Sequence, residues 1–289
     1  MKTDRTPENR RTLMVAGTLT AIVTTAALLR LIGISFGLPA VYNPDEVAIM
    51  SRALAFAKGD LNPHNFLYPT FFFYLLFAWV GVSYVVGYLV GAYASLASFQ
   101  TRFFVDPTNI YLAGRLLGVV TGCLGVVATY ALARRLSDRI AGLSAAALLA
   151  VAPFHVRDSH YVKHDVAATL AIVCAMIAIV WLAERPQQGR RRFIQAAVAA
   201  MACGVAVSTH YYAVFLVLPL TLAVLMGPDP LMTRIRLLAV AGLSTAAMFS
   251  LLSPFVLLDW TTAARDITAN RQIVVDRALD GRAGVFSNA

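Results

Sequence analysis

The chain has 289 residues, of which 59% are hydrophobic and 13% charged, and its mean hydropathy is +0.69. Polar surface this scarce excludes a soluble globular protein, and several apolar runs are long enough to span a bilayer. The formal charge of +9 does not indicate a nucleic-acid partner, because the Lys and Arg residues cluster in short loops between apolar runs. We therefore expect an all-α polytopic membrane protein, a bundle of several transmembrane helices.

The amino-terminal segment 1–11 carries four basic residues and precedes an apolar run over 12–38. Basic residues flanking a first span favour a cytoplasmic amino terminus, and the run lacks the small-residue cleavage site of a signal peptide. Arg30 lies near the far end of this run. It either extends to the outer interface, which we favour, or faces Asp45.

Two adjacent carboxylates, Asp45 and Glu46, follow the first span in the sequence YNPDE. An acidic side chain costs about 2.5 to 3.5 kcal/mol at the centre of a spanning helix and less at its rim, so the pair is expected at the water boundary. One interpretation is a site facing a cavity or a cationic partner. The other is that the pair only caps a short helix, for which Pro44 is suited to the first turn.

The first external loop, expected over 39–69, also contains an amphipathic segment. Residues 44–58 have the pattern of one amphipathic helix lying along the membrane surface, and Gly59 ends it. Its apolar side is expected to contain Val47, Met50, Leu54 and Ala57.

The remaining apolar runs alternate with loops of different charge. An aromatic stretch over 66–76 leads into apolar sequence as far as residue 99, followed by runs at 111–133, 140–155, 165–183, 193–208, 211–227 and 236–258. The basic loops at 134–139, 185–192 and 234–236 are expected to be cytoplasmic, which places 155–165, 208–212 and the tail 259–289 outside. Segment 70–99 must then begin and end on one side, as a hairpin, a re-entrant pair or a long oblique helix.

This topology gathers charged and titratable side chains at one external face. Arg115, His160 and Lys163 join the acidic pair there and favour a site, because Arg115 begins an otherwise apolar helix and needs a partner. Three further residues are interpreted as solvated loop charges: Arg157, Asp158 and His164. The three cysteines show no metal-binding spacing and are expected to be inert packing residues: Cys123, Cys174 and Cys203. No phosphate loop, His-rich metal motif or serine nucleophile motif is present.

An ordered set of motifs carries a family resemblance. YNPDE, LYPTFFFYLL, YLAGRLLGVVTGCLGVVATYALARRL, RIAGLSAAALLAVAP, FHVRDSHYVKHD and SPFVLLDW follow one another along most of the chain. Together they resemble the C-type membrane glycosyltransferases, in the group that contains protein O-mannosyltransferases and the aminoarabinose transferases of lipid A.

The resemblance implies an inverting enzyme of the cytoplasmic membrane that moves a sugar from a polyprenyl-phosphate donor to a lipid, glycan or protein acceptor hydroxyl outside. Asp45 would be the general base and Glu46 a positioning residue, while Arg115, His160 and Lys163 would hold the carrier phosphate. A base on the acceptor and cations on the leaving group are what direct displacement needs. No cofactor is expected to be required and no metal site is assigned, although a divalent metal is compatible with the sequence.

The chain departs from the resemblance in three places. Tyr68 stands where relatives often have His or Lys, and His210 stands where a Lys is common; both are additional site candidates, with Asp165. Relatives continue through further spans, so the chain is either a fragment lacking part of the lipid groove or a natural short form. The alternatives are a secondary transporter, which places charges near the midplane on broken helices, and an inactive assembly subunit.

Overall fold

The computed structural model describes residues 7–184 and 186–279, and in these residues it is built from helices joined by turns and loops. The elements are α1 Pro7–Leu31, α2 Pro44–Ala55, η1 Phe56–Lys58, α3 Phe71–Leu89, α4 Leu96–Val105, α5 Thr108–Leu136, α6 Arg139–Val151, α7 Pro153–Asp158, α8 Asp165–Glu184, α9 Arg190–Thr209, η2 Tyr211–Leu216, α10 Val217–Leu225, α11 Leu231–Leu252, α12 Phe255–Leu258 and α13 Trp260–Leu279.

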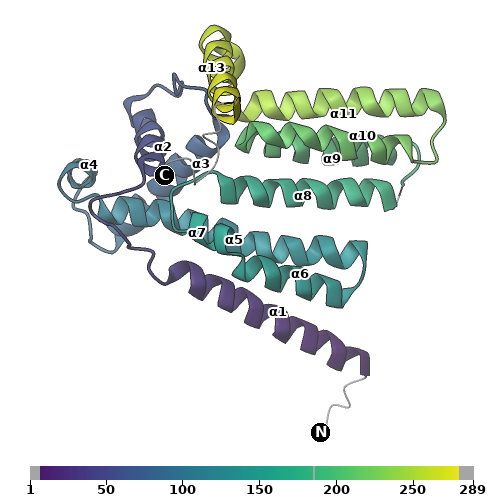
Figure 1. Ribbon diagram of the computed structural model, residues 1–289, viewed down its shortest axis with the longest axis horizontal. Helices are drawn as coiled ribbons and strands as arrows, with labels where there is room; N and C mark the ends of the chain where they lie inside the picture. The colour runs from purple at the N-terminus through teal and green to yellow at the C-terminus, as the bar shows by residue number, and fades with distance from the viewer. Residues whose placement is uncertain (1–6, 185, 280–289) are drawn as a thin grey trace.

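The long helices form a bundle in which α1, α5, α6, α8, α9 and α11 lie roughly along one direction (Figure 1). Six helices among the described residues are long and apolar enough to cross a membrane: α1, α3, α5, α8, α9 and α11. Large apolar side chains on the outer surface are well exposed, as at Leu148 (71%) and Leu243 (72%), which suits contact with lipid. The expected all-α polytopic membrane fold is confirmed.

Small residues allow the helices of the bundle to approach closely. On α9, a Cβ atom added at Gly204 would lie 2.7 Å from the Met248 side chain and 2.8 Å from the Thr245 carbonyl oxygen of α11. Cys203 is buried in the same apolar cluster. Close contact of this kind replaces the hydrophobic driving force that helices lack in lipid.

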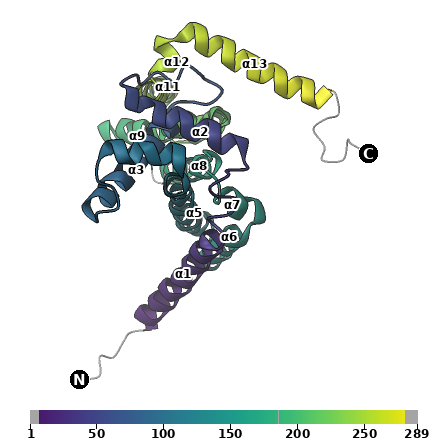
Figure 2. The same cartoon turned by 90° about the vertical axis from the view of Figure 1, so that its left-hand side faces the viewer.

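The short helix α2 and the longer α3 lie across one end of the bundle, as Figure 2 shows in a view along the bundle. Segment 70–99 is therefore a single crosswise helix followed by a turn and the start of α4, and neither a hairpin nor a re-entrant pair. The end of the amphipathic segment at Gly59 is confirmed, with a left-handed φ of 90°. The expected apolar side was right at Met50, which is buried, and wrong at Val47, which is 43% exposed, and at Ala57, which is exposed. The buried side is centred about one position earlier and is formed by Glu46, Ile49, Met50, Ala53 and Phe56.

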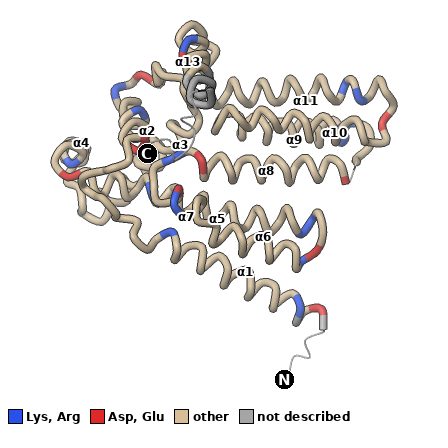
Figure 3. Tube along the Cα trace, in the orientation of Figure 1, with Lys and Arg blue, Asp and Glu red and all other residues tan. Residues whose placement is uncertain are grey.

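The loops between spans separate into two groups at opposite ends of the bundle (Figure 3). The loops after α5, α8 and α10 lie at the end away from α2, as the alternation of apolar runs predicted. One basic residue there is not solvated: Arg192 is 1% exposed, and its Nε donates to Asp229 at 3.0 Å.

Two of the expected spanning runs are broken into shorter pieces. The run 140–155 divides between α6, which ends at Val151, and α7, which begins at Pro153, because a proline favours a new first turn. The run 211–227 divides between η2 and α10. Both pairs stay at the length of short apolar helices rather than full spans.

The segment after residue 252 folds back onto the first loop. Thr70 N–H donates to the Ser253 hydroxyl at 3.2 Å, and Phe66 N–H donates to Asp266 at 3.0 Å. The Asn62 side chain donates to Asp259 at 3.0 Å. The polar side chains of this segment therefore fix the loop that carries the acidic pair.

Candidate functional site

The acidic pair is held at the end of the bundle by a buried ion pair. Arg115 on α5 donates through Nε and Nη2 to the two carboxylate oxygens of Glu46, at 2.9 and 2.8 Å. Both side chains are almost completely buried, and the Val162 N–H donates to the same carboxylate at 2.8 Å. The helix α2 is thereby fixed to α5 and to the segment before α8.

Two glycines on α5 make this arrangement possible. A Cβ atom at Gly114 would lie 2.7 Å from the Met50 side chain and 2.8 Å from that of Val162. A Cβ atom at Gly118 would lie 2.9 Å from the Ser159 carbonyl oxygen. The small-residue pattern of α5 thus lets both α2 and the 159–162 backbone approach Arg115.

Asp45 differs from its neighbour because it points to solvent. Its side chain is 59% exposed, and its carboxylate lies 2.9 Å from Lys163 Nζ. Asn43, and not Asp45, caps α2, since the Asn43 side chain accepts from the Asp45 N–H at 3.0 Å. Burial opposes the charge of Lys163, but the hydrogen bond and charge of Asp45, together with the charges of Asp165 and Asp158, outweigh it, so the pKa of Lys163 is raised.

Two of the expected phosphate ligands are engaged elsewhere. Arg115 is 1% exposed, and its Nη1 donates to the carbonyl oxygens of Ile34 and Phe36 at 2.7 and 2.8 Å, so the expectation of a direct phosphate contact is corrected. The ring nitrogens of His160 lie 2.8 and 2.9 Å from the carbonyl oxygens of Val156 and Ile32. Of the three expected ligands, only Lys163 combines partial exposure with contact to Asp45.

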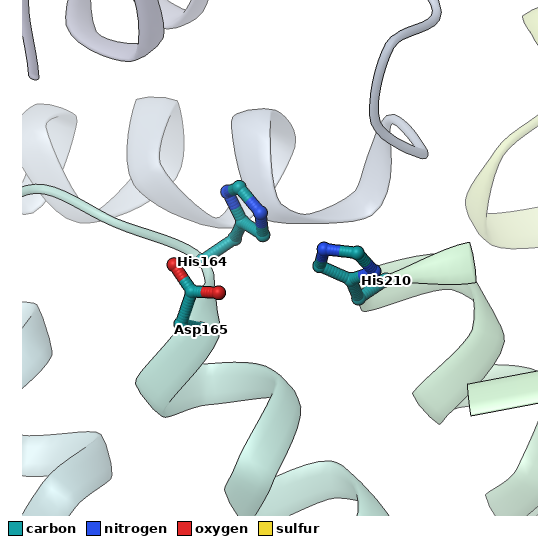
Figure 4. Close-up of side chains that lie close together, drawn as sticks. All are labelled: His164, Asp165 and His210. Carbon is teal, nitrogen blue, oxygen red and sulfur yellow. The ribbon is translucent and has the colours of Figure 1, made fainter. Parts of the chain in front are cut away.

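A cluster of two histidine rings and one carboxylate lies beside the ion pair of Asp45 and Lys163. His164, Asp165 and His210 offer ligand atoms within 4.8 Å of one another, and Figure 4 shows them drawn together from the start of α8 and the end of α9. The Tyr68 ring centroid lies 3.9 Å from that of His164. Burial lowers the pKa of His164 to about 4 and also lowers the pKa of His210, while burial and the charge of Asp45 raise the pKa of Tyr68.

An apolar cavity of about 310 Å³ lies between α3, α5, α8 and α9. Its lining includes Phe71, Ala171, Ala202 and Thr209, the last of which is the residue before His210. The cavity therefore lies in the apolar part of the bundle, and one of its lining residues is next in the sequence to a member of the polar cluster.

Sequence reasoning missed one buried network. Arg30 is fully buried and donates to the carbonyl oxygens of Ala26, Leu149 and Ala150 and to Nδ1 of His155. It neither extends to the interface nor faces Asp45, so both expectations were wrong. Arg157, expected to be solvated, pairs with its neighbour Asp158 and is 57% exposed.

The same arrangement of helices occurs in solved membrane enzymes. An Archaeoglobus fulgidus oligosaccharyltransferase in complex with Zn and sulfate superposes with a TM-score of 0.54 at 14% identity, over 94% of this chain and 40% of that one. The A. fulgidus oligosaccharyltransferase AglB, in complex with an inhibitory peptide and a dolichol-phosphate, gives 0.57 at 16% identity, over 96% and 35%. At these identities the likeness shows a shared fold, and the chain spans about two fifths or less of either structure's length.

The family is given by a second comparison. The model of the dolichyl-phosphate-mannose-protein mannosyltransferase family matches residues 97–257, more than half of the chain, and the chain belongs to this family. The matched region contains Arg115, the 155–165 segment and His210. No curated protein sequence matches the chain.

Proposed function

We propose that the protein transfers a sugar from a polyprenyl-phosphate donor to an acceptor hydroxyl, at the outer face of the cytoplasmic membrane and with inversion at the anomeric carbon. The family membership supports a lipid-linked donor, and one neighbour with the same fold is complexed with a dolichol-phosphate. The observation that carries the proposal is the exposed carboxylate of Asp45, 2.9 Å from Lys163 and fixed through its buried neighbour Glu46.

Asp45 is proposed as the general base. The acceptor oxygen forms a bond to the anomeric carbon while the bond from that carbon to the carrier phosphate oxygen breaks, and the hydroxyl proton passes to Asp45. A base must reach the hydroxyl, which exposure of Asp45 permits, and it must keep its position, which the pair of Glu46 and Arg115 provides.

Lys163 is proposed to stabilise the leaving phosphate. Its ammonium is partly exposed and kept charged beside Asp45, so it can contact a phosphate oxygen that gains negative charge as the sugar departs. The apolar cavity lined by Ala171 and Ala202 is proposed to receive part of the isoprenoid chain, since its lining is apolar and includes Thr209, the residue before His210. Arg115 and Glu46 then act as positioning residues.

The test is transfer of label from the lipid. Membranes that contain the protein are incubated with radiolabelled polyprenyl-phosphate sugars, and the water-soluble, peptide and lipid fractions are separated. We expect label to leave the carrier lipid only when the protein is present. Retention of all label on the carrier, across hexose and pentose donors and with lipid, glycan and peptide acceptors supplied, would contradict the proposed function.

A further inference from the structure

Three potential metal ligands converge from two separate parts of the chain. His164 and Asp165 stand at the start of α8, and His210 follows α9 some 45 positions later. Their ligand atoms all lie within 4.8 Å of one another, and Figure 4 shows the three side chains around a common space. No motif indicates this site, because the spacing of the three residues along the chain matches no metal-binding pattern.

The most buried member of the cluster lacks a protein partner. His164 is 4% exposed, and its Nδ1 is buried without a hydrogen-bond partner among the described residues. A buried polar atom left unpaired destabilises a fold, so such an atom needs an explanation. The Tyr68 ring packs 3.9 Å from the His164 ring but offers that nitrogen no hydrogen bond in this arrangement.

We propose that His164, Asp165 and His210 bind a divalent transition-metal ion, with Zn²⁺ as the ion that their chemistry fits best. Two imidazoles and one carboxylate are ligands that zinc takes when a further position is left for water or substrate. Ligand atoms about 2.0 Å from a tetrahedral zinc lie roughly 3.3 Å apart, so ligand atoms now within 4.8 Å of one another would have to approach by up to about 1.5 Å. Calcium and magnesium are disfavoured, because they prefer oxygen ligands.

The surrounding charges are compatible with a cation. The amino-terminal end of α8 carries a partial positive charge of about half an elementary charge, which opposes a cation. The carboxylate of Asp165 at the same helix end carries a full negative charge, which outweighs it. Asp45 and Lys163, whose opposite charges also act on His164, form an ion pair with each other. The rings of Tyr68 and Tyr212 lie against the two histidines and restrict their rotation.

The position of the site suggests what the ion contacts. His164 directly follows Lys163, and the apolar cavity ends at Thr209, beside His210. Lys163 is the residue proposed to contact the carrier phosphate, so a phosphate oxygen would be a chemically suitable further ligand for an ion held by its neighbour His164. The metal site itself follows from the three side chains and does not depend on the proposed transfer activity.

The experiment measures metal binding directly. The purified 289-residue chain in detergent is stripped with a chelator, titrated with Zn²⁺ and freed of excess ion, and zinc per chain is determined by elemental analysis. Co²⁺ is then titrated into the stripped protein to record the visible absorption of cobalt in a nitrogen and oxygen ligand field. The variants are His210→Gln and Asp165→Asn, and the matched control is His64→Gln, which removes a histidine that is 65% exposed and lies outside the cluster.

We expect one zinc per chain for the wild type and for His64→Gln, and at least roughly tenfold weaker binding for the two cluster variants. Zinc at the level of a detergent blank in the wild type would overturn the proposal, as would undiminished binding in both cluster variants. If the variants do not fold, the cobalt spectrum of the wild type decides: an absorption that saturates at one Co²⁺ per chain supports the site, and no such absorption contradicts it. None of these readouts is sugar transfer, so failure of the metal site and failure of the proposed activity are distinguishable.

Discussion

The carboxylate of Glu46 and the guanidinium of Arg115 form a bidentate ion pair with N–O distances of 2.9 and 2.8 Å, and this pair fixes α2 to α5 inside the protein. Breaking a buried pair by removing one partner leaves an unpaired buried charge, which costs about 3 to 5 kcal/mol. The pair therefore supports the position of Asp45 more than it contributes to chemistry.

The first prediction concerns this pair. Arg115→Ala is expected to lower the free energy of unfolding by about 3 to 5 kcal/mol, measured by denaturation in detergent. Arg157→Ala is the matched control, because that arginine is 57% exposed, and a change within about 0.5 kcal/mol is expected. A fully stable Arg115→Ala protein that uses the lipid donor poorly would return Arg115 to a direct phosphate role.

The second prediction is a pH dependence of stability centred on His155. Burial and the nearby Arg30 lower the pKa of His155 to about 4, from an ordinary value of about 6.5. The unfolded chain thus binds a proton that the folded protein does not, and stability falls as the pH drops from about 6.5 to 4. With allowance for its partial exposure, the loss is roughly 1 to 3 kcal/mol.

The measurement is unfolding of the wild type and His155→Gln across this pH range. His155→Gln keeps an acceptor for Arg30 but cannot titrate, so its curve is expected to be flatter between pH 6.5 and 4. His64→Gln should follow the wild type, since His64 is exposed. Parallel curves for wild type and His155→Gln would show that His155 is not held neutral.

The third prediction is the orientation in the membrane. In a background without the three native cysteines, Tyr42→Cys and Thr262→Cys should react with a membrane-impermeant thiol reagent in intact cells. Ser137→Cys and Gln188→Cys should not react, because their loops lie at the opposite end with the basic clusters (Figure 3). All but Thr262 are exposed sites, and Thr262 is half-buried. Labelling at 137 from outside would reverse the assignment of the site to the outer face.

The fourth prediction tests the apolar cavity. The Ala171→Phe side chain would fill part of the cavity that Ala171 lines. Each methylene of the donor chain that is kept out of the cavity lowers the binding free energy by about 0.8 kcal/mol. Exclusion of two methylenes therefore corresponds to a roughly tenfold higher apparent KM for the donor. A donor with a short, water-soluble chain should be affected less. Leu148→Phe, on the outer surface of α6, is the control. Equal effects of Ala171→Phe on long and short donors would place the isoprenoid chain elsewhere.

Local signals in the sequence predicted much of the fold. The composition and the spacing of apolar runs gave the class of protein, and Pro44 and Gly59 gave the limits of the first-loop helix. The buried side of that helix was missed because Glu46 faces inward, which no pattern of apolar residues indicates. Its partner Arg115 lies 69 positions later, and the close packing at Gly114 and Gly118 lets the two approach each other.

The candidate site was predicted only in part, because its contacts join residues that are far apart in the sequence. Asp45 and Lys163 were both assigned to one face, and they are in contact, but their pairing depends on how the first loop folds over α5. His164 was interpreted as a solvated charge, yet it is buried against Tyr68 and His210. The burial of Arg30 was missed because three of its acceptors are backbone carbonyl oxygens, two of them at the end of α6, which no side-chain motif reveals.

The central claim is that Asp45 is the general base, and Asp45→Asn tests it most directly. Asn43 caps α2, so the substitution is expected to leave the protein folded and inserted. Transfer of radiolabelled sugar from the polyprenyl-phosphate donor should fall by roughly 100-fold or more, the scale of general base catalysis. The Asp158→Asn variant, changed at a carboxylate paired with the exposed Arg157, should transfer normally. Normal turnover by Asp45→Asn would contradict the account.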